Sequence, residues 1–248
     1  MIAIANDLEL YERHADEWWD ERSPAFRSLR ATKKLHIELI ERLVDEEFGG
    51  RVGLLVDVGC GGGLLSVPLA DRAERVIGVD RSRASTRAAS DEARRTGRRC
   101  TFMNGDAVDV PLADGCADLV LLSDVVEHVV EPARCLVEAA RLLRPGGVLF
   151  VNTIARTRRA KFLAVTFAEG VGLVPRGTHD AEMFVSPDEL VEMASRAGLD
   201  LVRLEGEAPR VWATIRTWAI HLRRSRNTSV SYHAVFRKPA LDPSEVTP

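Results

Sequence analysis

Three side chains that can carry acid–base chemistry follow one apolar run. The run "ADLVLL" at residues 117–122 predicts a buried strand, and Asp124, Glu127 and His128 come soon after it. If a helix begins near Asp124, the i, i+3, i+4 spacing puts all three on one face. An imidazole with an ordinary pKa of about 6.5 can act as a general base near neutral pH. The pattern therefore predicts a reactive cluster where this strand ends.

The same three side chains allow two other hypotheses. Two carboxylates and an imidazole can hold a divalent cation such as Mg²⁺ or Zn²⁺, and a bound cation would stabilise a catecholate. Alternatively, Asp124 acts as a cap and the cluster is only a polar helix start. In each case the cluster lies at the carboxyl edge of the predicted sheet, where ligands of open α/β sheets bind.

A glycine-rich turn follows another apolar strand. In "DVGCGGG" the residues Gly59, Gly61 and Gly63 allow a tight turn and a close backbone approach to a ligand. Asp80 ends the next predicted strand, about 20 residues further on, where an acid can bind two ribose hydroxyls. A sharp strand-to-helix connection would also need glycine, but the strand, the helix and the spaced acid together favour a cofactor site.

Apolar strands alternate with helices over residues 53–153, which predicts an α/β fold with a mostly parallel sheet and helices on both faces. Leu35, Leu39 and Leu43 mark an amphipathic helix before this region. The expected helices cover residues 7–22, 31–47, 64–73, 82–97, 133–144 (ended by the Pro-Gly-Gly at 145–147) and 186–198, the last with a capping box formed by Ser186 and Glu189. The seven expected strands are in residues 53–63, 75–80, 100–106, 117–124, 148–153, 199–208 and 229–238.

These elements predict one domain with additions. Residues 1–48 are expected to form an amino-terminal helical lid, and residues 49–238 the ligand-binding domain. An insertion is expected at about residues 155–186, where the alternation breaks, and a disordered tail at residues 239–248. Lys33 and Lys34 are expected on a solvated helix face.

The composition excludes several classes of protein. Among 248 residues, 34 are basic and 37 acidic, so the net charge of −3 argues against nucleic acid as a partner. No apolar run approaches the roughly 20 residues of a membrane-spanning helix, and the amino-terminal residues lack a signal-peptide pattern. The four cysteines show no CxxC spacing and no disulfide or zinc framework, which predicts a cytoplasmic protein.

Residues 50–153 resemble the class I methyltransferases that use S-adenosylmethionine (SAM). The resemblance rests on the loop "DVGCGGG", on Asp80, on "NGDAVDVP", on "ADLVLLSDVVEHV" and on "RLLRPGGVLFV". It implies a Rossmann-like fold in which Gly59 and Gly61 border the methionine end of SAM and Asp80 binds its ribose. The full set of cofactor residues that it implies is Asp57, Gly59, Cys60, Gly61, Asp80, Arg81, Asp106, Ala107 and Ser123.

Two further stretches resemble the ubiquinone-biosynthesis O-methyltransferases, which include the 3-demethylubiquinone 3-O-methyltransferases and 2-polyprenyl-6-hydroxyphenol methylases. They are "YERHADEWWDE" at residues 11–21 and "VPRGTHDAEMFVSPDEL" at residues 174–190. The resemblance implies methyl transfer to the hydroxyl of a polyprenylated, lipophilic phenol or catechol, and some members use a divalent metal at the positions of Asp124, Glu127 and His128. Residues 205–229 depart from the family pattern.

Two alternatives to this function remain. The enzyme could methylate another small-molecule acceptor on O, N or C, or the chain could be a non-catalytic lipid-binding accessory protein.

The second stretch contains another candidate pair, His179 and Asp180. His179 could lie near the reacting oxygen, or Asp180 could orient it so that it only pins the loop. In the first stretch, Trp18 and Trp19 could line the lid or pack on the core. Adjacent residues on a helix diverge by about 100°, so the two tryptophans cannot both have the same role.

Residues 157–177 combine a basic start with apolar residues. Arg158, Arg159 and Lys161 precede Phe162 and Phe167. Such a segment suits the surface of an anionic bilayer, so peripheral contact with the inner face of the membrane is one hypothesis. The alternative is an ordinary amphipathic helix that packs on the domain or on a second subunit.

Overall fold

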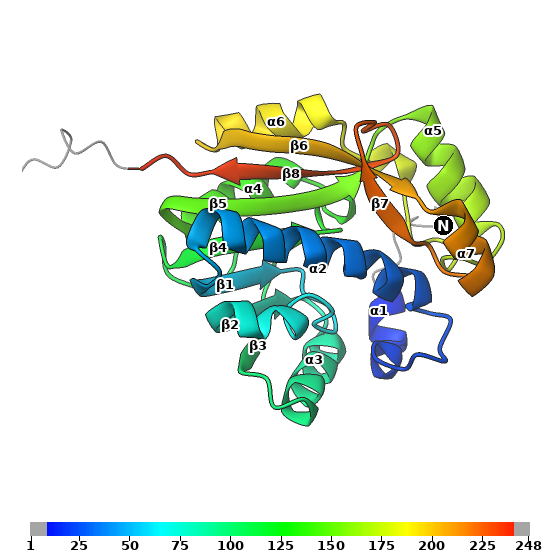
Figure 1. The fold of residues 1–248 in the computed structure, drawn as a ribbon, viewed down its shortest axis with the longest axis horizontal. Helices are drawn as coiled ribbons and strands as arrows, with labels where there is room; N and C mark the ends of the chain where they lie inside the picture. Colours follow the sequence, from blue (N-terminus) through cyan, green and yellow to red (C-terminus); the bar gives the residue numbers. More distant parts are fainter. Residues whose placement is uncertain (1–8, 241–248) are drawn as a thin grey trace, which may run out of the picture.

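The computed structural model describes residues 9–240 and has one sheet at its centre (Figure 1). The strand order is β3-β2-β1-β4-β5-β8-β6-β7, with β1 to β5 parallel to one another and β8 antiparallel to both β5 and β6. The strands are β1 (Val52–Val58), β2 (Ala73–Asp80), β3 (Cys100–Asn104), β4 (Ala117–Ser123), β5 (Leu143–Ile154), β6 (Asp200–Pro209), β7 (Leu222–Ser225) and β8 (Ser231–Arg237).

The predicted α/β class with a mostly parallel sheet is confirmed, but the sheet has eight strands and not seven. The additional strand β7 pairs only with β6 at the edge and lies in the segment 205–229 that departs from the family pattern. Its sequence "LRRS" has no apolar alternation, because an exposed edge strand does not need an apolar face.

Helices cover both faces of the sheet, as predicted. The helix α2 (Arg27–Phe48) packs its buried Ile40 and Val44 on one face. The helices α4 (Pro132–Leu142) and α6 (Pro187–Arg196) pack on the other face, and α3 (Arg83–Arg95) follows β2. The capping box predicted for α6 is present, with the Ser186 side chain accepting from the Glu189 amide.

The amino-terminal lid is less regular than the sequence predicts. Residues 9–17 form two short helices, α1 (Glu9–Arg13) and η1 (Ala15–Glu17), and residues 1–8 lie outside the described part of the chain. Buried Trp18 stacks on Phe26 with ring centroids 3.9 Å apart, and Leu64 completes this small core. The lid is therefore packed on the loop after β1.

Two predicted helices are wrong in part. Residues 64–67 form turns, and only the short 3₁₀ helix η2 (Pro68–Arg72) follows, because Gly63 has a left-handed φ of +80° and Pro68 lacks an amide hydrogen. The helix expected to run up to the Pro-Gly-Gly at residues 145–147 ends earlier, at Leu142, and β5 begins at Leu143. Of the expected tail, residues 241–248 lie outside the described residues.

The insertion after β5 contains three short helices and carries no strand between residues 155 and 186. They are α5 (Arg158–Ala160), the π-helical η4 (Lys161–Glu169) and η5 (Ala181–Met183). A further helix, α7 (Val211–Thr217), connects β6 to β7. None of the helices in residues 9–240 is long and apolar enough to cross a membrane.

Candidate active site

A cavity of about 860 Å³ lies where β1, β2 and β4 end. This volume is in the range of roughly 300–1,000 Å³ that small-molecule sites have. Parallel strands end at the same edge of a sheet, so the loops that follow them meet here. Most of the residues predicted for the site line the cavity: Asp57, Gly59, Cys60, Gly61, Asp80, Arg81, Asp106, Ala107, Ser123, Asp124, His128 and Asp180.

The glycine loop is built as the sequence predicts. The amides of Gly59 and Cys60 both donate to the carbonyl of Val79, at 2.7 and 3.1 Å, which ties the loop to β2. Gly59 has a φ of +74°, and a Cβ there would clash with Val125. A Cβ on Gly61 would lie 2.7 Å from the ring of Trp18. Glycine is therefore required at both positions by conformation and by space.

Asp80 is held by two backbone amides. The Gly61 amide donates to its Oδ2 at 2.8 Å, and the Ser82 amide donates to its Oδ1 at 2.9 Å. Burial raises the pKa of Asp80 despite these two bonds. Each carboxylate oxygen keeps a second lone pair, which can accept from a hydroxyl in the cavity. Two other lining residues, Arg81 and Asp106, approach each other, with Nε of Arg81 3.8 Å from Oδ2 of Asp106.

Two other residues of the loop have buried polar groups. Burial raises the pKa of Asp57 to about 6, and the hydroxyl of Ser66 donates to its carboxylate. Burial also raises the pKa of the Cys60 thiol well above its ordinary value, so this thiol is an unreactive part of the wall.

The lid closes over the loop through both tryptophans. Trp18 lines the cavity and donates from Nε1 to the hydroxyl of Ser85 at 3.1 Å. Trp19 donates from its own Nε1 to the carbonyl of Gly62 at 2.8 Å. Trp18 thus combines packing with lining, whereas Trp19 fixes the loop backbone.

Asp124 is at the centre of a polar network in the cavity wall. It has a left-handed φ of +56°, which an aspartate adopts more readily than most residues. Its Oδ1 accepts from the side-chain amide of Asn152 at 2.6 Å, and its Oδ2 accepts from Lys33 at 2.8 Å. Burial alone would raise the pKa of Asp124, but the Lys33 ammonium keeps it below its ordinary value.

The prediction of a solvated face for Lys33 is wrong. Its side chain is only 8% exposed, and its ammonium also donates to the hydroxyl of Ser123 at 2.6 Å. The adjacent Lys34 is exposed, as expected. The helix phase separates them, because Lys33 lies three residues before the buried His36.

Glu127 and His128 diverge from the predicted common face. The chain after Asp124 forms only the single 3₁₀ turn η3 (Val126–His128), so the α-helical spacing does not apply. Glu127 is buried, is absent from the cavity wall, and accepts from the Thr153 hydroxyl at 2.8 Å. Burial, together with the charge of Asp124, raises its pKa to about 8.

Within residues 9–240, no group of three His, Cys, Asp or Glu side chains is arranged to hold a metal ion. The metal hypothesis therefore gains no support from this geometry.

His128 does line the cavity. Burial, and then the neighbouring His179, lower its pKa to about 4, so its ring is neutral at pH 7. The ring of His179 stacks on it with centroids 6.0 Å apart, and Tyr11 from the lid approaches it edge-on at 6.4 Å. A neutral imidazole in a cavity wall can accept a proton.

His179 is oriented by Glu169 and not by Asp180. The Nδ1 of His179 lies 3.2 Å from Oε1 of Glu169, which also accepts from the His179 amide at 3.1 Å. Burial raises the pKa of Glu169, but the bonds from His179 and Gly177 lower it overall. Asp180 instead caps η5 by accepting from the Glu182 amide at 3.0 Å. The alternative in which Asp180 orients His179 is therefore wrong.

Three residues of this site are not indicated by the sequence patterns: Tyr11, Lys33 and Glu169. Tyr11 and Lys33 line the cavity, and both come from the lid. The helix phase of Lys33 could have identified it. Glu169 is ten residues from its partner across an irregular loop, and no periodicity connects the two.

Residues 56–151 match a family model described as a methyltransferase domain. Two solved structures have the same fold over 92% of this chain: a SAM-dependent methyltransferase from Thermotoga maritima (TM-score 0.66, 21% identity, 98% of that chain) and the magnesium protoporphyrin IX methyltransferase from Synechocystis PCC 6803 (TM-score 0.62, 19% identity, 93% of that chain). The fold and the glycine-loop cavity define a class I SAM-dependent methyltransferase.

Curated relatives are similar over nearly the whole chain. The ubiquinone biosynthesis O-methyltransferase of Methylococcus capsulatus is 34% identical over 238 residues, which are 94% of this chain and 95% of that protein. The protein of the same name from Methylobacterium sp. (strain 4-46) is 35% identical over 245 residues, 95% of this chain and 96% of that protein. The chain belongs to the ubiquinone biosynthesis O-methyltransferase family.

Proposed function

We propose that this enzyme transfers the methyl group of SAM to the hydroxyl of a polyprenylated phenol or catechol during ubiquinone biosynthesis. The family assignment supports the pathway. The observation that carries the chemistry is the placement of His128 in the wall of the same cavity as the glycine loop and Asp80. One cavity can thus hold the methyl donor and an acceptor side by side.

The residues present fit SAM. The glycine loop leaves no room for a Cβ at Gly59 or Gly61, and Asp80 keeps acceptor capacity for two ribose hydroxyls. Asp106 and Ala107 would border the adenine. When bound, SAM supplies a methyl group on a sulfonium sulfur, and the S–CH₃ bond breaks with its electron pair staying on sulfur as the O–CH₃ bond forms.

His128 would act as the general base. A phenol has an ordinary pKa of about 10, so at neutral pH its proton must leave before or during methyl transfer. The neutral ring of His128 can accept that proton. Burial and the neighbouring His179 weaken it as a base, whereas the negative charge of Asp124 favours the imidazolium that results. Lys33 holds Asp124 in place, so the charge that assists His128 is fixed.

His179 is a positioning residue in this mechanism. The ring of His179 stacks on His128, and the buried Glu169 fixes the orientation of the His179 ring. The arrangement resembles other sites in which a carboxylate holds an imidazole in one tautomer. A shift of Glu169 would therefore be transmitted through His179 to the base.

The acceptor's hydrocarbon tail gives residues 157–177 a function. Phe162 and Phe167 are exposed, whereas Ala160, Ala168 and Leu173 pack inward. The segment therefore anchors to the domain and keeps an apolar outer face beside Arg158 and Arg159. We infer peripheral contact with an anionic bilayer, in which a polyprenylated acceptor would reside.

A methylation assay over phenols and catechols of increasing tail length tests the proposal. We expect kcat/KM to rise from tailless to prenylated catechols. Measuring SAM binding by calorimetry on the same samples separates the alternatives. SAM binding without turnover on any acceptor would indicate a non-catalytic protein. Turnover that favours hydrophilic acceptors would indicate a different small-molecule substrate.

A further inference from the structure

The connection between β6 and β7 exposes large apolar side chains. On α7, Val211 is 60% exposed, Trp212 85% and Ile215 58%, and Trp218 directly after the helix is 48% exposed. A soluble surface seldom presents two tryptophans and two aliphatic residues within eight positions without a partner. Tryptophan is also the residue that membrane–water interfaces favour.

The backbone around Trp218 supports a functional role for it. Trp218 ends α7 in the left-handed region with a φ of +51°, which is costly for a bulky residue. An asparagine or a glycine would adopt this conformation more easily. The chain thus holds an exposed tryptophan in an unfavourable conformation.

The surroundings of α7 are strongly basic. Residues 208–241 contain no Asp or Glu, although the whole chain has 37. Arg210, Arg216, Arg223 and Arg226 are exposed in this segment. Burial, and then the charges of Lys34, Arg210 and Arg216, lower the pKa of His221, in agreement with a positive local potential. This charge complements an anionic surface.

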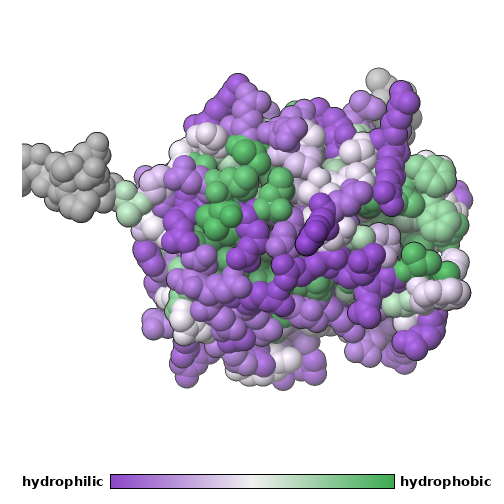
Figure 2. Space-filling view, turned by 45° about the horizontal axis from the view of Figure 1, so that its top comes forward, coloured by the Kyte–Doolittle hydropathy of each residue, from purple (hydrophilic) through white to green (hydrophobic). Residues whose placement is uncertain are grey.

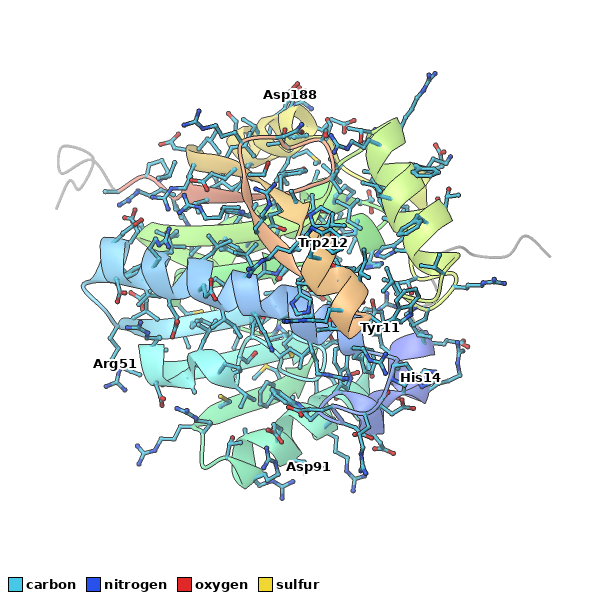
Figure 3. The ribbon with its side chains drawn as sticks, turned by 45° about the vertical axis from the view of Figure 1, so that its right-hand side comes forward. Tyr11, His14, Arg51, Asp91, Asp188 and Trp212 are labelled. Atoms are coloured by element: carbon cyan, nitrogen blue, oxygen red, sulfur yellow. The ribbon has the colours of Figure 1, made fainter. Side chains whose placement is uncertain are left out.

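The position of α7 relates it to the insertion and the lid. The hydroxyl of Ser28 on α2 donates to the carbonyl of Leu173 at 2.6 Å and accepts from the amide of Ile220 at 3.1 Å. One buried side chain therefore connects the insertion and the α7 segment. Figures 1 and 3 place α7 beside the lid, at the end of the molecule where α5 also lies. Figure 2 shows hydrophobic residues gathered at that end.

We propose that residues 210–218 are a second membrane anchor, which inserts Trp212 and Ile215 into the interface of an anionic bilayer. The inference rests on the proposed peripheral membrane contact and extends it to a segment that departs from the family pattern. A bilayer is favoured over a second copy of the chain, because the arginines of two facing copies would repel each other. With both anchors seated, the cavity lies next to the bilayer that holds the acceptor.

Vesicle binding tests this anchor. Vesicles of phosphatidylcholine with 30% phosphatidylglycerol are sedimented at low salt with the wild-type protein and with Trp212→Asp/Ile215→Asp. We expect the double variant to bind at least tenfold more weakly. Val137→Asp is the matched control, since Val137 is 57% exposed on α4, and it should bind like the wild type. All three proteins should methylate a short, water-soluble catechol equally.

Brominated lipids give a second readout that does not depend on the loss of a side chain. They should quench the wild-type tryptophan fluorescence, and Trp212→Phe should remove most of that quenching while binding is retained. If Trp212→Asp/Ile215→Asp binds vesicles as tightly as the wild type, the inference is overturned. A second double variant, Phe162→Asp/Phe167→Asp, tests the insertion, and loss of binding in this variant alone would leave the insertion as the sole anchor. Absence of wild-type binding would refute both membrane contacts without affecting the methylation assay. A wild-type dimer that the double variant converts to a monomer would also overturn the inference.

Discussion

Replacing Lys33 by methionine should destabilise the fold through one buried carboxylate. Methionine keeps the length and apolar stem of lysine but removes the ammonium. Asp124 would then keep the Asn152 bond of 2.6 Å and lose the Lys33 bond of 2.8 Å. Ser123 would also lose its donor. The perturbation is therefore local to the end of β4.

The geometry sets the size of this effect. Removing one partner of a fully buried ion pair costs about 3–5 kcal/mol. The Asp124 side chain is 28% exposed, so water can compensate part of the loss, and we expect about 2–3 kcal/mol. For a chain of this size, 1 kcal/mol corresponds to about 2–4 °C, so Tm should fall by about 4–12 °C. Adding Asp124→Asn to Lys33→Met should recover at least about 1 kcal/mol, since no charge is then left unpaired and asparagine tolerates the left-handed backbone.

Urea unfolding followed by tryptophan fluorescence measures these free energies. Lys34→Met is the matched control, because Lys34 is exposed on the same helix, and it should change stability by less than about 0.5 kcal/mol. If Lys33→Met and Lys34→Met unfold at the same urea concentration, the Lys33–Asp124 pair contributes nothing. The double-mutant cycle would then show no coupling, and the argument for a fixed Asp124 charge would fail.

Four further substitutions test the site. Asp80→Ala should weaken SAM binding by more than about tenfold in calorimetry, since two bonds to a charged group are worth roughly 1.5–3 kcal/mol each; an unchanged dissociation constant would reject its role. His128→Ala should remove most turnover with SAM affinity retained. Wild-type activity that survives exhaustive chelation by EDTA would favour the base over the metal hypothesis. Glu169→Gln should lower kcat at least about tenfold without changing SAM affinity, and an unaltered kcat would separate His179 from the reaction. Glu127→Gln should gain thermal stability relative to the wild type as pH rises from 5 to 8, because the raised pKa of about 8 means that the stability contributed by protonated Glu127 is lost over that interval; parallel melting curves would contradict the shift.

Local patterns were sufficient for the sheet and for the cofactor side of the cavity. Strand periodicity identified β1 to β5, and the glycine loop with Asp80 followed from the conformations that glycine alone tolerates. These features depend on residues close in sequence, so a single chain contains the information. The strand β7 was missed because "LRRS" at the sheet edge is stabilised by pairing with β6 and not by an apolar face.

The acceptor side required tertiary structure. Asp124, Glu127 and His128 were correctly placed at the end of β4, but their roles diverge because the chain turns in a 3₁₀ conformation. A pair of adjacent lysines usually indicates a solvated face, but Lys33 shares the helix phase of the buried His36 and is itself buried. The contact of Glu169 with His179 depends on how an irregular loop closes, which no spacing rule describes.

The protonation states of this cluster suit the reaction. At neutral pH, burial keeps Glu127 protonated and His128 neutral, while Asp124 remains charged beside Lys33. The four groups together therefore carry almost no net charge. Methyl transfer from a sulfonium to a phenolate converts two opposite charges into neutral products, and such a reaction is slowed by strong solvation of the starting charges. In the proposed mechanism, a buried wall with one compensated ion pair and one neutral imidazole would take the phenol proton without surrounding the acceptor with water. The same wall is compatible with a hydrocarbon tail, which a cluster of uncompensated carboxylates would exclude.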